Sequence, residues 1–146
     1  MKKEVKYRLI KHLSFLENEL KDYGFFNSLT WEEYNSDRNK RRNVERWIEN
    51  IINSSIDIAK IILAHEGLPL ADTYKDTIDK LSTIAGFDTE NTGQLSRWVK
   101  LRNIISHEYL DIRWASIKNF ISESKLLYED FFKKVNKYLQ EQVEGK

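Results

Sequence analysis

The sequence predicts an all-α protein, an antiparallel bundle of about five helices, and three observations support this fold class. Apolar residues recur at intervals of three and four over most of the 146 residues. The chain has only five Gly and one Pro, and 32% of its residues are charged, with both signs mixed. No stretch alternates between apolar and polar residues for long enough to form a strand. We therefore expect helices joined by short connections.

The first third of the chain predicts three helical segments. The apolar positions of residues 3–23 predict a helix that ends at Tyr23-Gly24 (Val5, Leu9, Leu13, Leu16 and Leu20). Thr30-Trp31-Glu32-Glu33 is a capping-box pattern and predicts a short helix. A long helix is then expected from Ser36-Asp37 to Glu66, where Gly67 and Pro69 end it.

The long helix has an unusual distribution of side chains. Its apolar residues cover more than one face, which is typical of a helix at the centre of a bundle or shared with a second subunit. A polar stripe runs opposite, with steps of four, three, four and three residues: Arg46, Asn50, Asn53, Asp57 and Lys60. Asp57 is flanked by two isoleucines. It could orient a catalytic group across a cleft, or it could belong to a solvent-facing stripe.

Three more helices are expected in the second half. One begins at an Asp72 or Thr73 cap and ends at Gly86, and Asp88 caps the next. The inner face of that fourth helix carries Leu95, Trp98, Leu101 and Ile105. Asp111 is expected to cap a fifth helix that reaches Tyr138. We expect one helical domain over residues 1–146, with a core of about 38–138 on which the N-terminal helix packs.

Composition limits the classes of function. The chain has no cysteine, no apolar run long enough to cross a bilayer and no signal peptide, so a cytoplasmic protein without disulfides is expected. The net charge of +1 does not suit a general polyanion binder. Any contact with RNA must therefore be local. Basic residues at the start of the long helix could track an RNA backbone, or be ordinary surface: Arg38, Arg41, Arg42 and Arg46.

The segment from Arg102 to Tyr109 has the form R-x4-H-x-Y and is the best candidate for a catalytic site. His107 can transfer a proton near neutral pH, and Arg102 can bind two phosphate oxygens at once. RNA supplies its own nucleophile, the 2′-hydroxyl, so these groups suffice to cleave it without a metal or cofactor. The chain has only three His and no H-x3-H or D-x-D cluster, so we expect no metal site.

Two aspects of this segment remain open from the residues alone. On an ideal helix His107 points about 140° away from Arg102, so the two converge only if the helix ends or distorts near Ser106, or if two chains contribute. A purely structural interpretation is the alternative. In that case Arg102 pairs with Asp57 or a glutamate, His107 is an ordinary helix-end residue and Tyr109 belongs to the core.

Arg102-Asn103 followed by His107-Glu108-Tyr109, at the end of the fourth helix of an all-α chain, resembles the HEPN superfamily and most closely its HepT-like branch. The resemblance extends from about Arg38 to Tyr138 and includes the Pro69…Thr73-Tyr74-Lys75-Asp76 linker. It implies a homodimeric, metal-independent endoribonuclease toxin that cleaves tRNA or mRNA. The resemblance further implies that Arg102 and His107 are the catalytic pair of this chain, supported by the polar Asn103.

The resemblance also implies regulation by a partner. Tyr109 matches the tyrosine to which an MntA-like nucleotidyltransferase antitoxin transfers AMP. The added charge and bulk would then block RNA. Two alternatives from other classes remain: a catalytically silent HEPN module that serves as a binding partner of the nucleotidyltransferase, and a structural helical dimer without chemistry.

Overall fold

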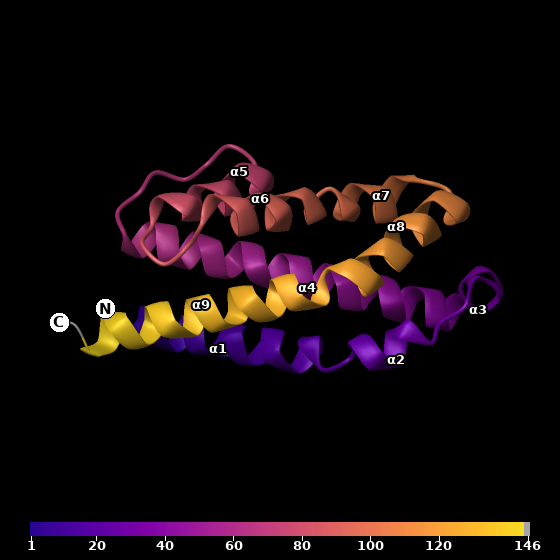
Figure 1. Ribbon diagram of the computed structural model, residues 1–146, viewed down its shortest axis with the longest axis horizontal. Coiled ribbons are helices and arrows are strands. Elements are labelled where there is room, and N and C mark those ends of the chain that lie inside the picture. The colour runs from indigo at the N-terminus through magenta and orange to yellow at the C-terminus, as the bar shows by residue number, and fades with distance from the viewer. Residues whose placement is uncertain (145–146) are drawn as a thin grey trace.

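The structure is a computed structural model that describes residues 1–144, and its regular elements are all helical (Figure 1). Within these residues it has nine α-helices and one 3₁₀-helix: α1 (Lys3–Leu20), α2 (Tyr23–Asn27), α3 (Trp31–Ser36), α4 (Arg38–His65), α5 (Tyr74–Asp79), the 3₁₀-helix η1 (Lys80–Thr83), α6 (Thr89–Trp98), α7 (Leu101–His107), α8 (Leu110–Glu123) and α9 (Lys125–Glu144). The long segments alternate in direction along the chain, which confirms the predicted all-α bundle.

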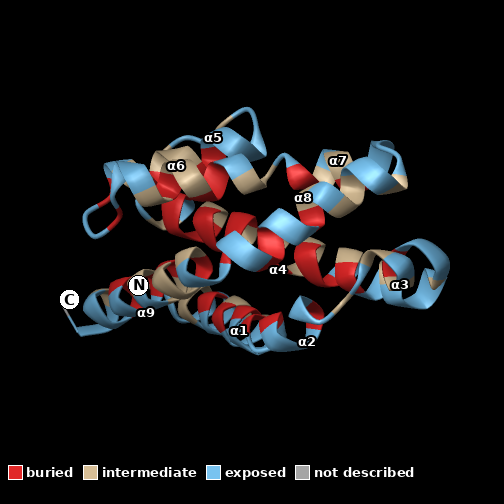
Figure 2. Ribbon diagram, turned by 45° about the vertical axis from the view of Figure 1, so that its right-hand side comes forward, coloured by how far each residue is buried: buried red, intermediate tan, exposed pale blue. Residues whose placement is uncertain are grey.

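Helix α4 lies at the centre of the bundle, as its broad apolar arc predicts. It packs against α1 on one side and against α3, α5 and α7 elsewhere. Its buried residues form a nearly continuous band along the helix, red in Figure 2. Helix α1 also packs against α9, so the N-terminal helix contributes Leu9, Leu13 and Leu16 to the same hydrophobic core. Each fully buried leucine of this kind contributes roughly 1.5–3 kcal/mol of transfer free energy.

The prediction of about five helices was too low, and the break between α6 and α7 is one reason. A single fourth helix was expected, but the chain turns at Val99 and Lys100. There the amides of Val99, Lys100 and Arg102 donate to carbonyls three residues earlier, at 3.2, 3.3 and 3.2 Å. This is the tighter 3₁₀ pattern, which rotates α7 relative to α6. The side chains of α7 therefore do not continue the inner face of α6.

The predicted fifth helix is also two helices, separated at Ser124. The Ser124 hydroxyl donates to the carbonyl oxygen of Phe120 at 2.6 Å and lies 2.7 Å from the hydroxyl of Tyr23. Tyr23 starts α2 instead of ending α1, and its ring stacks on Phe120. The bend thus follows from a contact between residues about 100 positions apart, which no local pattern reveals.

Several predicted caps are confirmed and one is wrong. Thr30 forms the full capping box of α3, and the side chains of Asp37, Thr73 and Asp88 cap α4, α5 and α6. The third predicted helix ends earlier than Gly86, because α5 passes into η1. Asp111 is not a cap, because α8 begins at Leu110 and Tyr109 occupies the capping position without a side-chain hydrogen bond.

The arrangement leaves the α7–α8 turn at the end of the molecule opposite both termini (Figure 1). The turn is also on the exposed side of the bundle, pale blue in Figure 2. Across residues 1–144 every helix is too short or too polar to cross a membrane. The candidate residues Arg102 to Tyr109 therefore lie on an open surface at one end of a helical bundle.

Candidate functional site

The α7–α8 turn exposes the two residues that the sequence analysis identifies as most reactive. Helix α7 ends at His107, and Glu108 and Tyr109 have extended backbones, with ψ angles of 165° and 162°. His107 is exposed, and 82% of the Tyr109 surface is accessible. The structural alternative, in which Tyr109 belongs to the core, is therefore wrong. Its side chain makes no capping hydrogen bond to α8.

Arg102 faces a different part of the surface from His107. Its guanidinium carbon lies 4.9 Å from the centre of the Tyr74 ring, a cation–π distance. It forms no ion pair within the described residues, so the predicted alternative of a pair with Asp57 or a glutamate does not occur there. Arg102 lines a cavity of about 460 Å³ together with Asn103 and Ser106.

The end of α7 does not by itself bring Arg102 and His107 together. His107 is absent from the described residues that line the Arg102 cavity. The helix does end after His107, as one of the two predicted routes to convergence requires. Yet both residues lie on the regular helix α7, five positions apart, so their side chains leave the helix in directions about 140° apart. A site that uses both groups on one phosphate therefore needs a second chain or a movement of side chains.

The position of the turn is held by a network that the sequence analysis missed. The Arg113 Nε–H donates to the backbone carbonyl of Glu108 at 2.8 Å, and its terminal nitrogen lies 3.3 Å from a carboxylate oxygen of Glu45. The buried Tyr34 hydroxyl donates to the same Glu45 oxygen. Burial, followed by the hydrogen bond and charge of Glu45, raises the pKa of Tyr34, so the phenol stays protonated. The carbonyl between His107 and Tyr109 is thus tied to α4 and α3.

Replacing Arg113 by alanine is expected to destabilise the protein by about 1–3 kcal/mol, because it leaves the Glu45 carboxylate without its cation. The Glu45 side chain is only 13% exposed, so water compensates for little of this loss. The free energy of unfolding from denaturant titration measures the effect. Arg97→Ala is the matched control, since Arg97 is exposed and makes no side-chain hydrogen bond in the described chain. Equal stability of the two variants would mean that the network contributes nothing.

The other predicted site residues are not all near the turn. Asp57 lines a separate cavity of about 400 Å³ between α1 and α4, with His12, Asn50 and Asn53. It is therefore not positioned to orient Arg102 within one chain. Asn103 is exposed and lines the Arg102 cavity.

The four arginines of the basic cluster at the start of α4 have different environments in the structure. Arg41 is partly buried and donates to the backbone carbonyls of Tyr34 and Asn35, at 2.9 and 3.1 Å. Its guanidinium therefore fixes the end of α3. Arg38, Arg42 and Arg46 are exposed. These three remain candidates for RNA contact.

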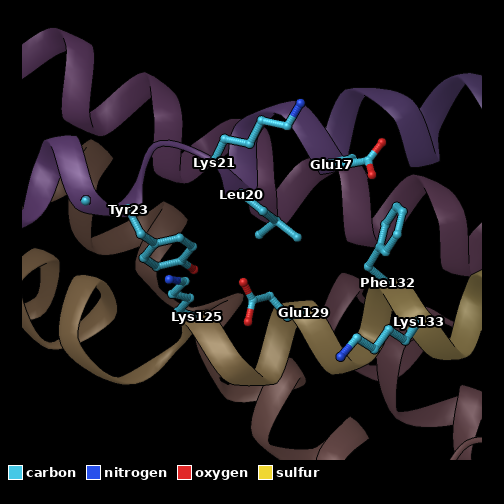
Figure 3. Close-up of a pocket in the computed structure, with 9 residues that line it drawn as sticks. Glu17, Leu20, Lys21, Tyr23, Lys125, Glu129, Phe132 and Lys133 are labelled. Atoms are coloured by element: carbon cyan, nitrogen blue, oxygen red, sulfur yellow. The ribbon is translucent and has the colours of Figure 1, made fainter.

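A further cavity of about 410 Å³ lies between the end of α1 and α9 (Figure 3). Figure 3 shows Glu17 and Lys21 on one side of it and Glu129 and Lys133 on the other. Its charges are of both signs, and no histidine is among its described lining residues. Within residues 1–144, no three acidic or histidine side chains are grouped so that they could hold a metal ion.

The sequence analysis did not identify Tyr74 or Arg113 as part of the site, and the sequence carries only weak signals of their roles. Tyr74 stands in the linker that carries the family resemblance, but nothing there indicates its contact with Arg102. Arg113 lies four residues after Tyr109, one helical turn into α8, which hints at a local role. Its partner Glu45 is 68 residues earlier in the chain. No periodicity links the two.

Comparisons with known proteins give one family and one fold. The family model described as HepT-like ribonuclease matches residues 10–137, which include most of α1 and the whole α7–α8 turn. A solved structure of a tri-AMPylated Shewanella oneidensis HEPN toxin in complex with MNT antitoxin is similar, with a TM-score of 0.76 and 17% identity over 88% of this chain and 96% of that one.

Two further crystal structures are similar at 16% identity, each over 88% of this chain and 97% of the other. A toxin–antitoxin with AMP-PNP has a TM-score of 0.77. A tyrosine-to-alanine mutant of a toxin–antitoxin called MntA–HpeT has a TM-score of 0.76. At these identities the likeness concerns the fold. No curated protein sequence matches the chain.

Proposed function

Because this chain belongs to the HepT-like ribonuclease family, we propose that it is a metal-independent endoribonuclease toxin that cleaves RNA with Arg102 and His107. The observation that carries the proposal is the α7–α8 turn, where the exposed His107 stands two residues from the exposed Tyr109. His107 transfers protons between the 2′-hydroxyl, the leaving 5′-oxygen and water. Arg102 stabilises the charge that develops on the phosphorane. Asn103, which lines the same cavity as Arg102, assists in holding the phosphate.

The second part of the proposal is a homodimer. Arg102 and His107 of one chain line different surfaces, so the pair acts on one phosphate when Arg102 of one protomer faces His107 of its partner. Twofold symmetry then creates two such sites at once. This arrangement supplies both a fixed cation and a proton carrier without changing the course of α7.

The third part concerns control of the activity. We infer that a nucleotidyltransferase antitoxin of the MntA type transfers AMP to Tyr109. The phenolic oxygen attacks the α-phosphorus of ATP, the phenolic proton is lost and pyrophosphate leaves. The support is twofold: 82% of Tyr109 is exposed, and a similar fold is described as an AMPylated HEPN toxin with its MNT antitoxin. The added phosphodiester brings negative charge and a bulky nucleoside beside His107, and both repel an RNA strand.

A catalytically silent module is the second candidate. The observation that favours it is the separation of His107 from the Arg102 cavity within one chain. In this case the protein presents Tyr109 to the nucleotidyltransferase and binds partners without cleaving RNA.

Cleavage of RNA in the presence of EDTA separates the two candidates. The wild-type protein is expected to cleave single-stranded RNA equally well with and without the chelator, because no step needs a metal. His107→Ala is expected to lower the rate about 10²–10⁴-fold, the usual contribution of a general acid or base. His12→Ala is the matched control, since His12 lies in the cavity between α1 and α4. Absence of cleavage by the wild type favours the silent module, and cleavage that survives in His107→Ala assigns the activity to another site.

A further inference from the structure

The cavity beside Arg102 is lined mainly by basic and polar groups. It lies between α4, the start of α5 and the segment that joins α6 to α7, with a volume of about 460 Å³. Its described lining includes three basic side chains, Lys75, Lys100 and Arg102, and one acidic one, Glu49. Asn103 and Ser106 add neutral groups that can donate hydrogen bonds. This volume falls in the range of small-ligand sites, and its charge suits an anion.

Tyr74 lines this cavity and contacts two cations, of which Arg102 also lines the cavity and Lys60 adjoins it through the ring. The ammonium nitrogen of Lys60 lies 4.7 Å from the centre of its ring, and the guanidinium carbon of Arg102 lies 4.9 Å from the same point. Each contact is attractive and restricts the freedom of a long side chain. The ring itself is anchored at the first position of α5, where the Thr73 hydroxyl accepts the amide hydrogen of Asp76.

Four basic residues of the described chain form ion pairs, and only one of them, Lys75, lines this cavity. Lys40, Arg113 and Lys134 all form ion pairs, and Lys75 pairs with Asp79 at 3.0 Å. Within residues 1–144, Lys60, Lys100 and Arg102 form none. The two cations at the Tyr74 ring repel each other, and an anion bound beside them relieves that repulsion.

We propose that this cavity is a subsite for a phosphodiester of the RNA strand that flanks the scissile one. Lys60 and Lys100 bind the flanking phosphate, Arg102 contacts the scissile phosphate, and Tyr74 is a positioning residue that holds Lys60 and Arg102. The subsite rests on the proposed ribonuclease function. It adds to the exposed part of the basic cluster, from which Arg41 is removed because it already binds the backbone of α3.

The salt dependence of RNA binding tests the subsite directly. Binding of a single-stranded RNA oligonucleotide is measured in a His107→Ala background, so that the strand is not cut, and the affinity is determined at several salt concentrations. Adding Lys60→Ala is expected to weaken binding about five-fold and to reduce the slope of log K against log salt by about 0.7, the effect of one lost phosphate contact on a single strand. Lys137→Ala, which removes an exposed lysine of α9, is expected to leave both quantities unchanged.

Variants at Tyr74 distinguish positioning from a general loss of folding. Tyr74→Phe keeps the aromatic ring and is expected to bind RNA as the parent does. Tyr74→Leu keeps the size but removes the ring's attraction for cations, and it is expected to weaken binding as Lys60→Ala does. Helical circular dichroism checks that all variants are folded.

The outcomes separate the subsite from the function on which it rests. An unchanged salt slope in Lys60→Ala, with RNA still bound, overturns the subsite and leaves the ribonuclease proposal standing. Equal binding by Tyr74→Phe and Tyr74→Leu overturns the role of Tyr74. If the His107→Ala parent binds no RNA while the wild type cleaves none, the ribonuclease proposal itself is refuted and the subsite with it.

Discussion

Replacing Tyr109 by phenylalanine is expected to abolish transfer of AMP to this protein. The change removes only the phenolic oxygen, which is the atom that forms the new bond to phosphorus. The ring has no packing role to lose, because 82% of the residue is exposed and its side chain makes no capping bond. Incubation with a cognate MntA-like nucleotidyltransferase and ATP labelled at the α-phosphate measures the incorporated AMP.

The chain provides a matched control for this experiment. Tyr7 is the next most exposed tyrosine, at 62%, and lies on α1 away from the α7–α8 turn. Tyr7→Phe is expected to accept AMP at the wild-type level. In cells, the Tyr109→Phe toxin should also escape neutralisation that depends on AMP transfer. Continued labelling of Tyr109→Phe would show that another residue is the acceptor and would remove the proposed means of control.

Mixing two inactive variants, Arg102→Ala and His107→Ala, is expected to restore RNA cleavage. If each site combines Arg102 of one protomer with His107 of the other, a hybrid dimer contains one intact site and one doubly damaged site. Random exchange of subunits makes half of the dimers hybrid. The recovered activity should then reach about a quarter of the wild-type value, because half of the dimers each carry one of two sites. Each variant alone is expected to remain far below this level.

A double variant provides the control for this complementation. Wild-type subunits mixed with the Arg102→Ala, His107→Ala double variant form hybrids in which each site lacks one group. The hybrids are then inactive, so the activity should equal that of the wild-type dimers that remain. If the sites are built within one chain, the first mixture stays inactive and every hybrid in the second keeps one working site. A molar mass equal to one chain in solution would refute the shared site outright.

Local interactions explain how much of the fold the sequence could predict. Helices α1, α3, α4 and α6 begin or end close to their expected positions, because caps such as Thr30 and Asp37 act on backbone groups two or three residues away. The number of helices was underestimated in part because the break at Ser124 depends on a distant contact. Ser124 meets Tyr23, and the bend lets both α8 and α9 bury their aromatic residues.

The candidate site shows the same difference between features set by local interactions and features set by long-range contacts. The helical class, most of the caps and the reactive groups between Arg102 and Tyr109 are predictable from the residues, since they depend on residue type and on neighbours within one or two turns. The exposure of Tyr109, the contact of Arg102 with Tyr74 and the link from Arg113 to Glu45 are visible only in the folded chain. These contacts and exposures depend on which helix faces are buried against each other. Residues far apart in the chain determine that packing, and no periodicity within one helix records it.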